Sequence, residues 1–156
     1  MSKFDDAMKL LDEKLGGRDG LIALSTVAPE PGPDGLCRPA ARIVNAYYED
    51  GAFYTVTYAT TAKMRQIEKN PNVAVCVIVD NFTADGIGEN LGWTRDAKNL
   101  ELTAKLREIF AEWYDEANND DDPNTCILRV RLTKGLWNDP HEGLRNEVDF
   151  VNKTAD

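Results

Sequence analysis

Hydroxyl and ammonium groups gather at residues 60–63, where they could bind a phosphate ester. The sequence reads Thr60-Thr61-Ala62-Lys63 and falls where a β-rich run gives way to a short helical pattern. The first turn of a helix offers free backbone N–H groups and the positive end of the helix dipole, and both favour an anion. Two hydroxyls and one ammonium within a single turn add further donors. The segment therefore indicates a candidate phosphate site.

Arg42 is a second candidate for the same site, because it lies in the strand before a predicted hairpin. An Asp50-Gly51 step between two β-rich runs is a strong hairpin signal. Pairing about this step places positions near 42 beside positions near 58–60, so Arg42 and Lys63 could converge. The alternative interpretation is that Thr61 is only a helix N-cap and that Lys63 is a solvated residue of the first turn.

Other patterns in the chain do not predict a second chemistry. The glycines of residues 86–92 lack the spacing and the βαβ context of a dinucleotide-binding loop, so they are expected to mark strand bends. The acidic residues 115–122 lack the central Gly and final Glu of a calcium loop, which favours a solvated helix exit, with weak divalent binding as the alternative. His141 is the only histidine, so no metal ligands are assigned and no residue is nominated as catalytic.

The elements that position these residues follow from the spacing of apolar side chains. Helical spacing over residues 4–15, before the Gly16-Gly17 pair, predicts an opening helix. A short helix is expected after Thr61, and a long one over residues 94–114. Residues 73–79 are apolar throughout and are expected to form a strand buried on both faces. The other predicted strands are 21–27, 38–48, 52–58, 82–89, 125–132 and 148–151.

These elements predict a mainly β fold with peripheral α-helices. Runs of strands follow one another without an intervening helix, which favours a six- to seven-stranded antiparallel barrel with three helices over a doubly wound parallel sheet. The chain has 156 residues and neither a linker nor an internal repeat. We therefore expect a single domain over residues 1–156.

Composition argues against several classes of partner. Eighteen Lys and Arg against 27 Asp and Glu give a formal net charge of −9, which disfavours nucleic acid and anionic membrane surfaces. The longest apolar run, residues 73–79, is far short of the ~20 residues of a membrane-spanning helix. The first residues lack the apolar region of a secretory signal, and the three cysteines form no C-x-x-C motif. A cytoplasmic protein with free thiols is expected.

Five motifs stand in order between residues 38 and 79. They are Arg42-Ile-Val-Asn-Ala-Tyr-Tyr48, Asp50-Gly51, Phe53-Tyr-Thr55, Thr60-Thr61-x-Lys63 and Gln66-Ile67-x-x-Asn70-Pro71-x-Val73. In order and spacing, they resemble the core of the pyridoxamine 5′-phosphate oxidase-like FMN-binding split-barrel family. The resemblance implies an antiparallel split barrel that forms a homodimer, with FMN in a cleft between the subunits.

The resemblance also implies roles for individual residues. Those that would contact FMN are Arg42, Lys63, Thr60 and Thr61 at the phosphate, Ile43, Val44 and Asn45 along the flavin, and Thr57 and Tyr58 on the neighbouring strand. The implied function is a flavin-dependent oxidoreductase that acts on a small molecule. The alternatives are a non-enzymatic holder or sensor of FMN, deazaflavin or haem, and a structural dimer without cofactor.

Two departures from the family pattern bear on the substrate. Ala62 stands where the oxidases that make pyridoxal phosphate usually have an Arg, so one phosphate contact is missing. Those enzymes also have a longer carboxyl-terminal segment that ends in an Arg-x-His substrate site, which residues 143–150 resemble only faintly. We therefore expect a substrate other than pyridoxamine phosphate.

Overall fold

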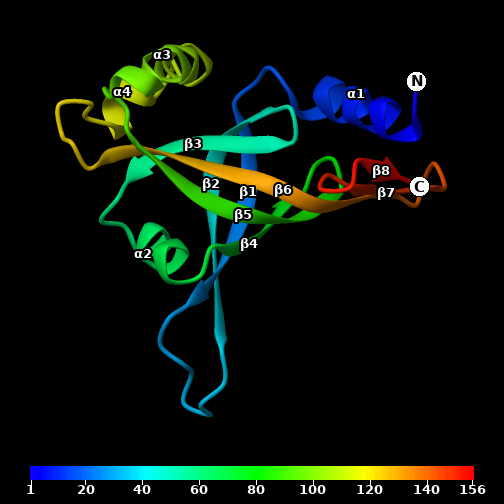
Figure 1. Cartoon of the computed structure of the whole chain (residues 1–156), viewed down its shortest axis with the longest axis horizontal. Coiled ribbons are helices and arrows are strands. Elements are labelled where there is room, and N and C mark those ends of the chain that lie inside the picture. The colour runs from blue at the N-terminus through cyan, green and yellow to red at the C-terminus, as the bar shows by residue number, and fades with distance from the viewer.

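The computed structural model describes the backbone of residues 1–156 and every side chain except that of Leu144. Helices surround a central β structure, and a long hairpin projects from it (Figure 1). The helices are α1 (Lys3–Leu15), α2 (Ala62–Lys69), α3 (Leu100–Ile109) and α4 (Tyr114–Ala117), with a 3₁₀ turn at Ala97–Asn99. The strands are β1 (Gly20–Ala28), β2 (Arg38–Glu49), β3 (Ala52–Tyr58), β4 (Asn72–Val77), β5 (Phe82–Trp93), β6 (Thr125–Asp139), β7 (Leu144–Asp149) and β8 (Thr154–Ala155).

Six of the strands close into an antiparallel barrel. Neighbouring strands follow the order β3-β2-β1-β4-β5-β6, and β6 pairs back onto β3. The two short strands β7 and β8 extend the sheet beyond β6. The expected mainly β antiparallel barrel is confirmed. The extra strand and the extra helix relative to the expected counts are the two-residue β8 and the one-turn α4.

The hairpin between β2 and β3 turns at Asp50-Gly51, as predicted. Both residues have positive φ, 46° and 78°, which is the geometry of a tight two-residue hairpin turn. However, only three residue pairs join these strands before β2 turns onto β1 and β3 turns onto β6. Arg42 therefore lies opposite Leu24 of β1, and the expected pairing of position 42 with positions 58–60 is wrong.

Residues 73–79 do not form a strand buried on both faces. In β4, Val73, Val75 and Val77 are buried in the barrel, whereas the alternate residues are partly exposed. Ile78 and Val79 lie beyond the strand and are 72% and 95% exposed. The prediction failed because an apolar run does not tell whether a second layer covers the outer face.

The predicted helix over residues 94–114 is broken into shorter pieces. Asn99 donates hydrogen bonds to the carbonyls of Leu91 and Trp93, which ties the segment before α3 to the end of β5. After Ile109, Phe110 leaves helical geometry, and its ring packs on Trp113 with centroids 4.7 Å apart. The apolar stripe was real, but tertiary packing divides it between two helices.

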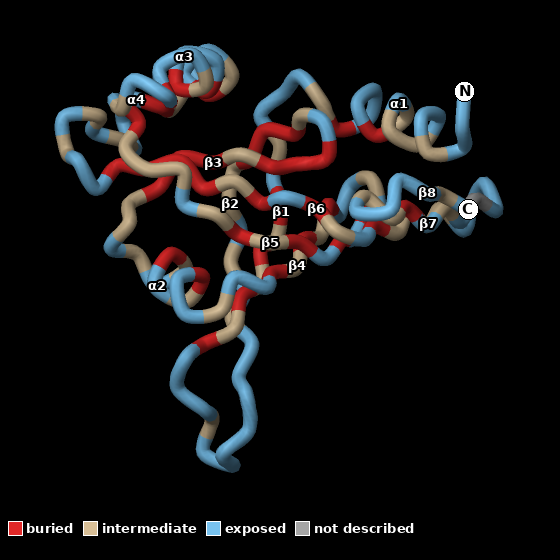
Figure 2. The backbone as a smooth tube through the Cα atoms, viewed as in Figure 1, coloured by how far each residue is buried: buried red, intermediate tan, exposed pale blue. Residues whose placement is uncertain are grey.

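The hydrophobic core has two parts. Figure 2 shows the buried segments of the backbone in red. The larger part fills the barrel and receives Leu11 and Leu15 from α1 and Met64 and Ile67 from α2. The smaller part lies between the outer side of β3 and the helices α3 and α4. Within the described residues, the structure has no helix long and apolar enough to cross a membrane.

Candidate functional site

Arg42 lies at the edge of the barrel interior and is held by neutral acceptors. Its Nη1 donates to Thr26 Oγ1 at 2.7 Å and to the Leu24 carbonyl at 3.2 Å, and its Nη2 donates to Gln66 Oε1 at 2.8 Å. The side chain is half-buried, and burial lowers the pKa of the guanidinium from its usual value. An arginine remains protonated at any physiological pH, so a full positive charge is present here without a carboxylate beside it.

Lys63, the second residue of α2, carries a second positive charge to the same place. Burial is the main cause that lowers the pKa of its ammonium, and the nearby charge of Arg42 lowers it further. Within the described part of the chain, no carboxylate lies within ion-pair distance of either Lys63 or Arg42. Two cations that repel each other without a counter-ion favour the binding of an anion.

The start of α2 supplies hydrogen-bond donors to the same corner. Thr61 occupies the N-cap position, but its hydroxyl donates to the Tyr58 carbonyl at 2.9 Å and makes no capping bond to the helix. The first N–H groups of α2 are therefore left uncapped by this side chain, and Thr60 beside them is exposed. Uncapped N–H groups at the positive end of a helix suit an anionic ligand.

Two of the other predicted residues lie on the opposite face of β2. Ile43 and Asn45 point out of the barrel, whereas Val44 packs toward its interior. Ile43 is 59% exposed. Asn45 Nδ2 donates to Asp19 Oδ1 at 2.8 Å, and the other oxygen of Asp19 accepts from Trp113 Nε1 at 2.7 Å. The structure therefore divides the predicted flavin-lining residues between the two faces of one strand.

The last two predicted residues, Thr57 and Tyr58, end strand β3. Thr57 is buried and pairs with Cys126 of β6. The Tyr58 hydroxyl accepts from the backbone N–H of Asn119 at 3.0 Å, so this side chain serves to hold the loop after α4. Arg42, Lys63 and the start of α2 thus meet at one corner, which we call the cationic corner, while Tyr58 and Asn45 are engaged elsewhere.

Sequence reasoning missed three residues at the cationic corner. Thr26 and Gln66 bind Arg42, and Cys126 lies near Lys63. Burial raises the pKa of the Cys126 thiol to about 11, an effect that the charge of Lys63 opposes. Gln66 could have been found from its spacing, because residues three apart on a helix share a face and Gln66 follows Lys63 by three. Nothing in the sequence indicates that Cys126 approaches Lys63.

The acidic residues 115–122 are more ordered than the expected solvated helix exit. Asp120 accepts hydrogen bonds from Thr94 and Tyr114 and forms an ion pair with Arg107, which also pairs with Asp115. Its side chain is only 10% exposed. The stretch therefore ties α3, α4 and the end of β5 together, and no cluster that could hold a metal ion is found among the described residues.

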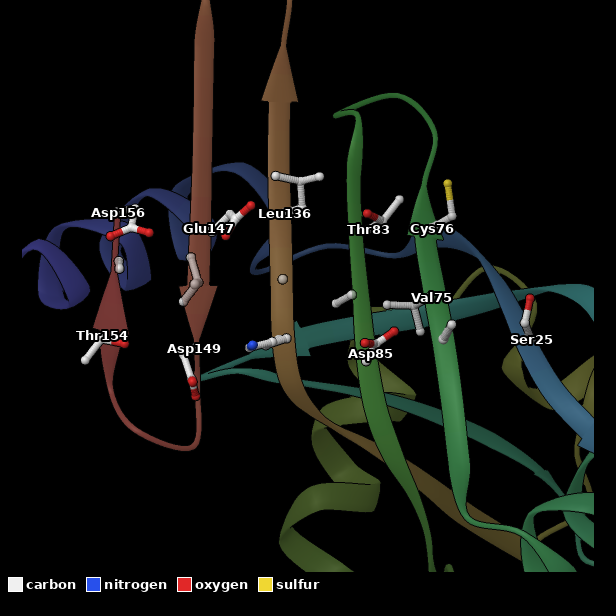
Figure 3. A pocket seen from close by; sticks show the side chains of 16 residues that line it. Ser25, Val75, Cys76, Thr83, Asp85, Leu136, Glu147, Asp149, Thr154 and Asp156 are labelled. Carbon is white, nitrogen blue, oxygen red and sulfur yellow. The ribbon is translucent and has the colours of Figure 1, made fainter.

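A hollow of about 580 Å³ lies away from the cationic corner. It is a groove on the sheet, and Figure 3 shows its side chains on the neighbouring strands β1, β4, β5, β6, β7 and β8. Lys134 lies among four carboxylates along the groove. These are Asp85, Glu147, Asp149 and Asp156. This charge pattern does not suit a phosphate ester, so the groove and the cationic corner are distinct features.

The family model for pyridoxamine 5′-phosphate oxidase matches residues 15–136, which include the barrel strands up to three residues before the end of β6. The chain belongs to this family. A curated member, general stress protein 26 of Bacillus subtilis (strain 168), is 30% identical over 98 residues, which are 60% of this chain and 66% of that protein. The chain therefore matches slightly less than two thirds of the length of this relative.

Solved structures of the same fold differ in the ligands that their descriptions name. A pyridoxamine 5′-phosphate oxidase-related FMN-binding protein of Nostoc punctiforme aligns with a TM-score of 0.58 at 16% identity, over 94% of this chain and 89% of its own. A heme-binding protein of Mycobacterium smegmatis aligns with a TM-score of 0.63 at 13% identity, over 86% and 55%. An F420 reductase aligns with a TM-score of 0.52 at 20% identity, over 79% and 94%.

Proposed function

We propose that this member of the pyridoxamine 5′-phosphate oxidase family binds FMN through the cationic corner. The observation that carries the proposal is that two positively charged side chains, Arg42 and Lys63, lie close together at the uncapped start of α2. Neither of them forms an ion pair with a carboxylate of the described residues. A phosphate dianion would relieve the repulsion between the two cations and accept hydrogen bonds from the first N–H groups of α2. Thr60 lies at the same helix start and adds a hydroxyl donor, whereas Thr61 could add one only by giving up its hydrogen bond to the Tyr58 carbonyl.

The flavin ring would then lie along β2, where Ile43, Val44 and Asn45 follow Arg42. FMN, when bound, supplies the electron-transfer chemistry that no side chain of the chain provides. The chain itself anchors the phosphate and orients the ring. Ala62 is exposed beside Lys63 and carries no charge, at the position where the oxidases that make pyridoxal phosphate usually have an Arg. The phosphate would therefore be held by two cations here, Arg42 and Lys63.

We propose further that two copies of the chain form a homodimer with the cofactor at their interface. The outer face of β1, β2 and β4 supports this assembly, because small and apolar residues form cross-strand rows there. Ala41, Ser25 and Ala74 form one row, and Ile43, Ala23 and Cys76 form the next. Ile43, which is expected to line the flavin, lies 59% exposed in this face. A second copy on this face would cover both the flavin and the sheet.

The proposed activity is a redox reaction of an unidentified small molecule, carried out by residues 1–156 as one domain. A cytoplasmic setting agrees with the three free cysteines, one of them exposed at position 37. Nucleic acid is not proposed as a partner, because the net charge of −9 repels it. The heme-binding protein and the F420 reductase of similar fold favour a second candidate, a holder of haem or deazaflavin.

The visible spectrum of freshly purified, untagged protein tests the proposal. A flavin spectrum that bleaches on addition of NAD(P)H supports the oxidoreductase, and a flavin spectrum that does not bleach supports a cofactor holder. A Soret band would instead assign the corner to haem. Protein that is colourless and takes up neither FMN nor F420 in a titration contradicts the proposal.

A further inference from the structure

Gln66 makes the contact that orients Arg42 at the cationic corner. Its Oε1 accepts from Arg42 Nη2 at 2.8 Å and from Thr26 Oγ1 at 2.5 Å, and Arg42 Nη1 donates to the same Thr26 hydroxyl at 2.7 Å. The three side chains form a closed triangle that joins α2, β1 and β2. Neither the spacing of the motifs nor the proposed FMN contacts include this triangle.

The direction of every hydrogen bond in the triangle follows from chemistry. Arginine has donors only, so Gln66 must present its carbonyl oxygen and not its amide nitrogen to Arg42. The Thr26 hydroxyl accepts from Arg42 and gives its own hydrogen to Gln66. Thr26 is 2% exposed, so water does not compete for these bonds on its side. The arrangement therefore has one stable pattern of donors.

The triangle holds the guanidinium without neutralising its charge. Arg42 uses Nη1 for Thr26 and the Leu24 carbonyl and one N–H of Nη2 for Gln66. The Nε–H group and the second N–H of Nη2 have no acceptor in the described protein. Arg129 provides the contrast, because it forms an ion pair with the carboxylate of Glu89 at 2.9 Å. A neutral acceptor at position 66 keeps Arg42 available for an anion.

The same helix delivers both Lys63 and Gln66 to Arg42. Residues three apart on a helix lie on one face, and Lys63 and Gln66 are three apart in α2. Ile67 and Met64 are buried beside them and fix α2 against the barrel. The position of one helix therefore sets both cations relative to each other.

We infer that Gln66 is a positioning residue for anion binding. Its role requires a neutral oxygen, because a neutral acceptor directs Arg42 toward the ligand without neutralising the positive charge of Arg42. The inference rests on the proposed function for the identity of the anion as FMN. It extends that proposal by assigning a task to a side chain that is not itself expected to touch the cofactor.

The first test compares binding of FMN and of riboflavin, which lacks the phosphate, by flavin fluorescence. Gln66→Glu places a carboxylate against Arg42 with almost no change in shape, and we expect it to weaken FMN binding at least about tenfold while riboflavin binding is unchanged. Gln66→Met, which removes the acceptor without adding charge, should weaken FMN binding by a smaller factor. Lys69→Gln is the matched control, since it makes the same change in net charge at an exposed residue of α2.

Two results of this comparison would overturn the inference. The first is equal weakening of FMN binding by Gln66→Glu and Lys69→Gln, which would make the effect one of net charge alone. The second is equal loss of FMN and riboflavin binding, which would reflect a damaged fold. A thermal melt serves as a further check, because Gln66→Glu adds an ion pair with Arg42 and should not lower the melting temperature.

The second test uses cofactor-free protein and therefore does not depend on FMN. The Arg42 side-chain N–H signals in ¹⁵N NMR spectra, assigned through their loss in Arg42→Lys, should exchange slowly in the wild type and faster in Gln66→Met. Equal exchange in both proteins would overturn the positioning role, whatever binds. If wild-type protein fails to bind FMN while the exchange difference is seen, the proposed function fails and the role of Gln66 stands.

Discussion

At the scale of residues, the cationic corner concentrates two charges that the fold leaves without a counter-ion. Arg42 is bound to neutral oxygens and Lys63 to no carboxylate of the described chain, although the net charge of the molecule is −9. The protein thus keeps a local positive site within an acidic surface. Solvent screening is weak in a half-buried position, so this local charge outweighs the distant carboxylates for a bound ligand.

Replacement of Arg42 by alanine is expected to weaken FMN binding by about 1.5–3 kcal/mol, because it removes charge-assisted hydrogen bonds to the phosphate. Titration followed by flavin fluorescence measures the change. Arg145→Ala is the control, since Arg145 is 62% exposed on β7 and bound only to Glu147. If Arg42→Ala leaves the affinity for FMN unchanged, the phosphate does not bind at this corner.

In the proposed site, Lys63 is expected to make FMN binding sensitive to alkaline pH. Burial and the charge of Arg42 lower the pKa of Lys63, so the ammonium loses its proton at a lower pH than an exposed lysine does. In the proposed site the charged form would bind the phosphate, so affinity should be complete below this pKa and should fall as the pH rises through it. Titrations between pH 7 and about 10.5 should show the fall in the wild type.

Lys63→Arg is the matching variant for this pH series. An arginine keeps its charge at every pH in the series, so the alkaline fall in FMN affinity should be absent or much smaller. Identical pH profiles for the two proteins would show that another group controls the alkaline limb.

The types and spacing of Arg42 and Lys63 were enough to predict this pair, but not the route by which they meet. The hairpin was expected to bring position 42 beside position 60, whereas α2 folds under the barrel and carries Lys63 to Arg42. The residues that pair beyond a tight turn depend on the position at which each strand stops pairing with its hairpin partner and begins to pair with another strand. That point is set by the whole barrel and not by the turn.

At the scale of elements, local signals predicted most of the helices and strands. Asp50-Gly51 and the periodic stripe of α1 were read correctly because turn geometry and helical amphipathicity are encoded within a few residues. The outer exposure of β4 and the break after Ile109 were not predicted, since both depend on what lies against the segment in space. The glycines of β5 were expected to mark strand bends, and the register of β5 against β6 does shift between Asp85 and Gly86.

Gly88 of β5 controls the approach of α2 to the barrel. A Cβ atom built on Gly88 would lie 2.9 Å from Ile67 Cγ2, which is buried, so in Gly88→Ala the Ile67 side chain, and α2 with it, must give way. We expect a loss of about 1–3 kcal/mol in the free energy of unfolding from this overpacking. FMN affinity should fall as well, because α2 carries Lys63 and Gln66. Urea denaturation and FMN titration measure the two effects.

Gly20→Ala is the control for this prediction. Gly20 also lies in a strand, but its added Cβ would meet only the Ala46 carbonyl at 3.4 Å, an ordinary contact. This variant should keep its stability within about 0.5 kcal/mol. A Gly88→Ala protein as stable as the Gly20→Ala protein would mean that α2 adjusts without strain.

At the scale of the whole molecule, the barrel is covered unevenly. α1 and α2 pack into its core and α3 lies over β3, while the outer face of β1, β2 and β4 remains open (Figures 1 and 2). The hairpin formed by the ends of β1 and β2 and by residues 29–37 projects beyond the barrel, and residues at its tip are exposed. An open face of this kind is what the proposed homodimer would cover.

The protein is expected to be a dimer at micromolar concentration, with a mass that does not change on dilution within this range. Light scattering coupled to size exclusion measures the mass. Ala74→Arg places a long charged side chain in the middle of the open face and should produce a monomer. Ala104→Arg, the same change on the exposed side of α3, should leave the dimer intact. A wild-type monomer would contradict the shared cleft.

The two chain ends offer a practical route to these measurements. Residues of α1 and the final residues 155 and 156 line one hollow, and both ends lie on the side of the barrel away from α2 (Figure 1). A biotin tag or a surface linker attached at either terminus would therefore tether the molecule from the side of the barrel away from α2. Soluble nucleotides and flavins could then be flowed over one immobilised sample and compared directly.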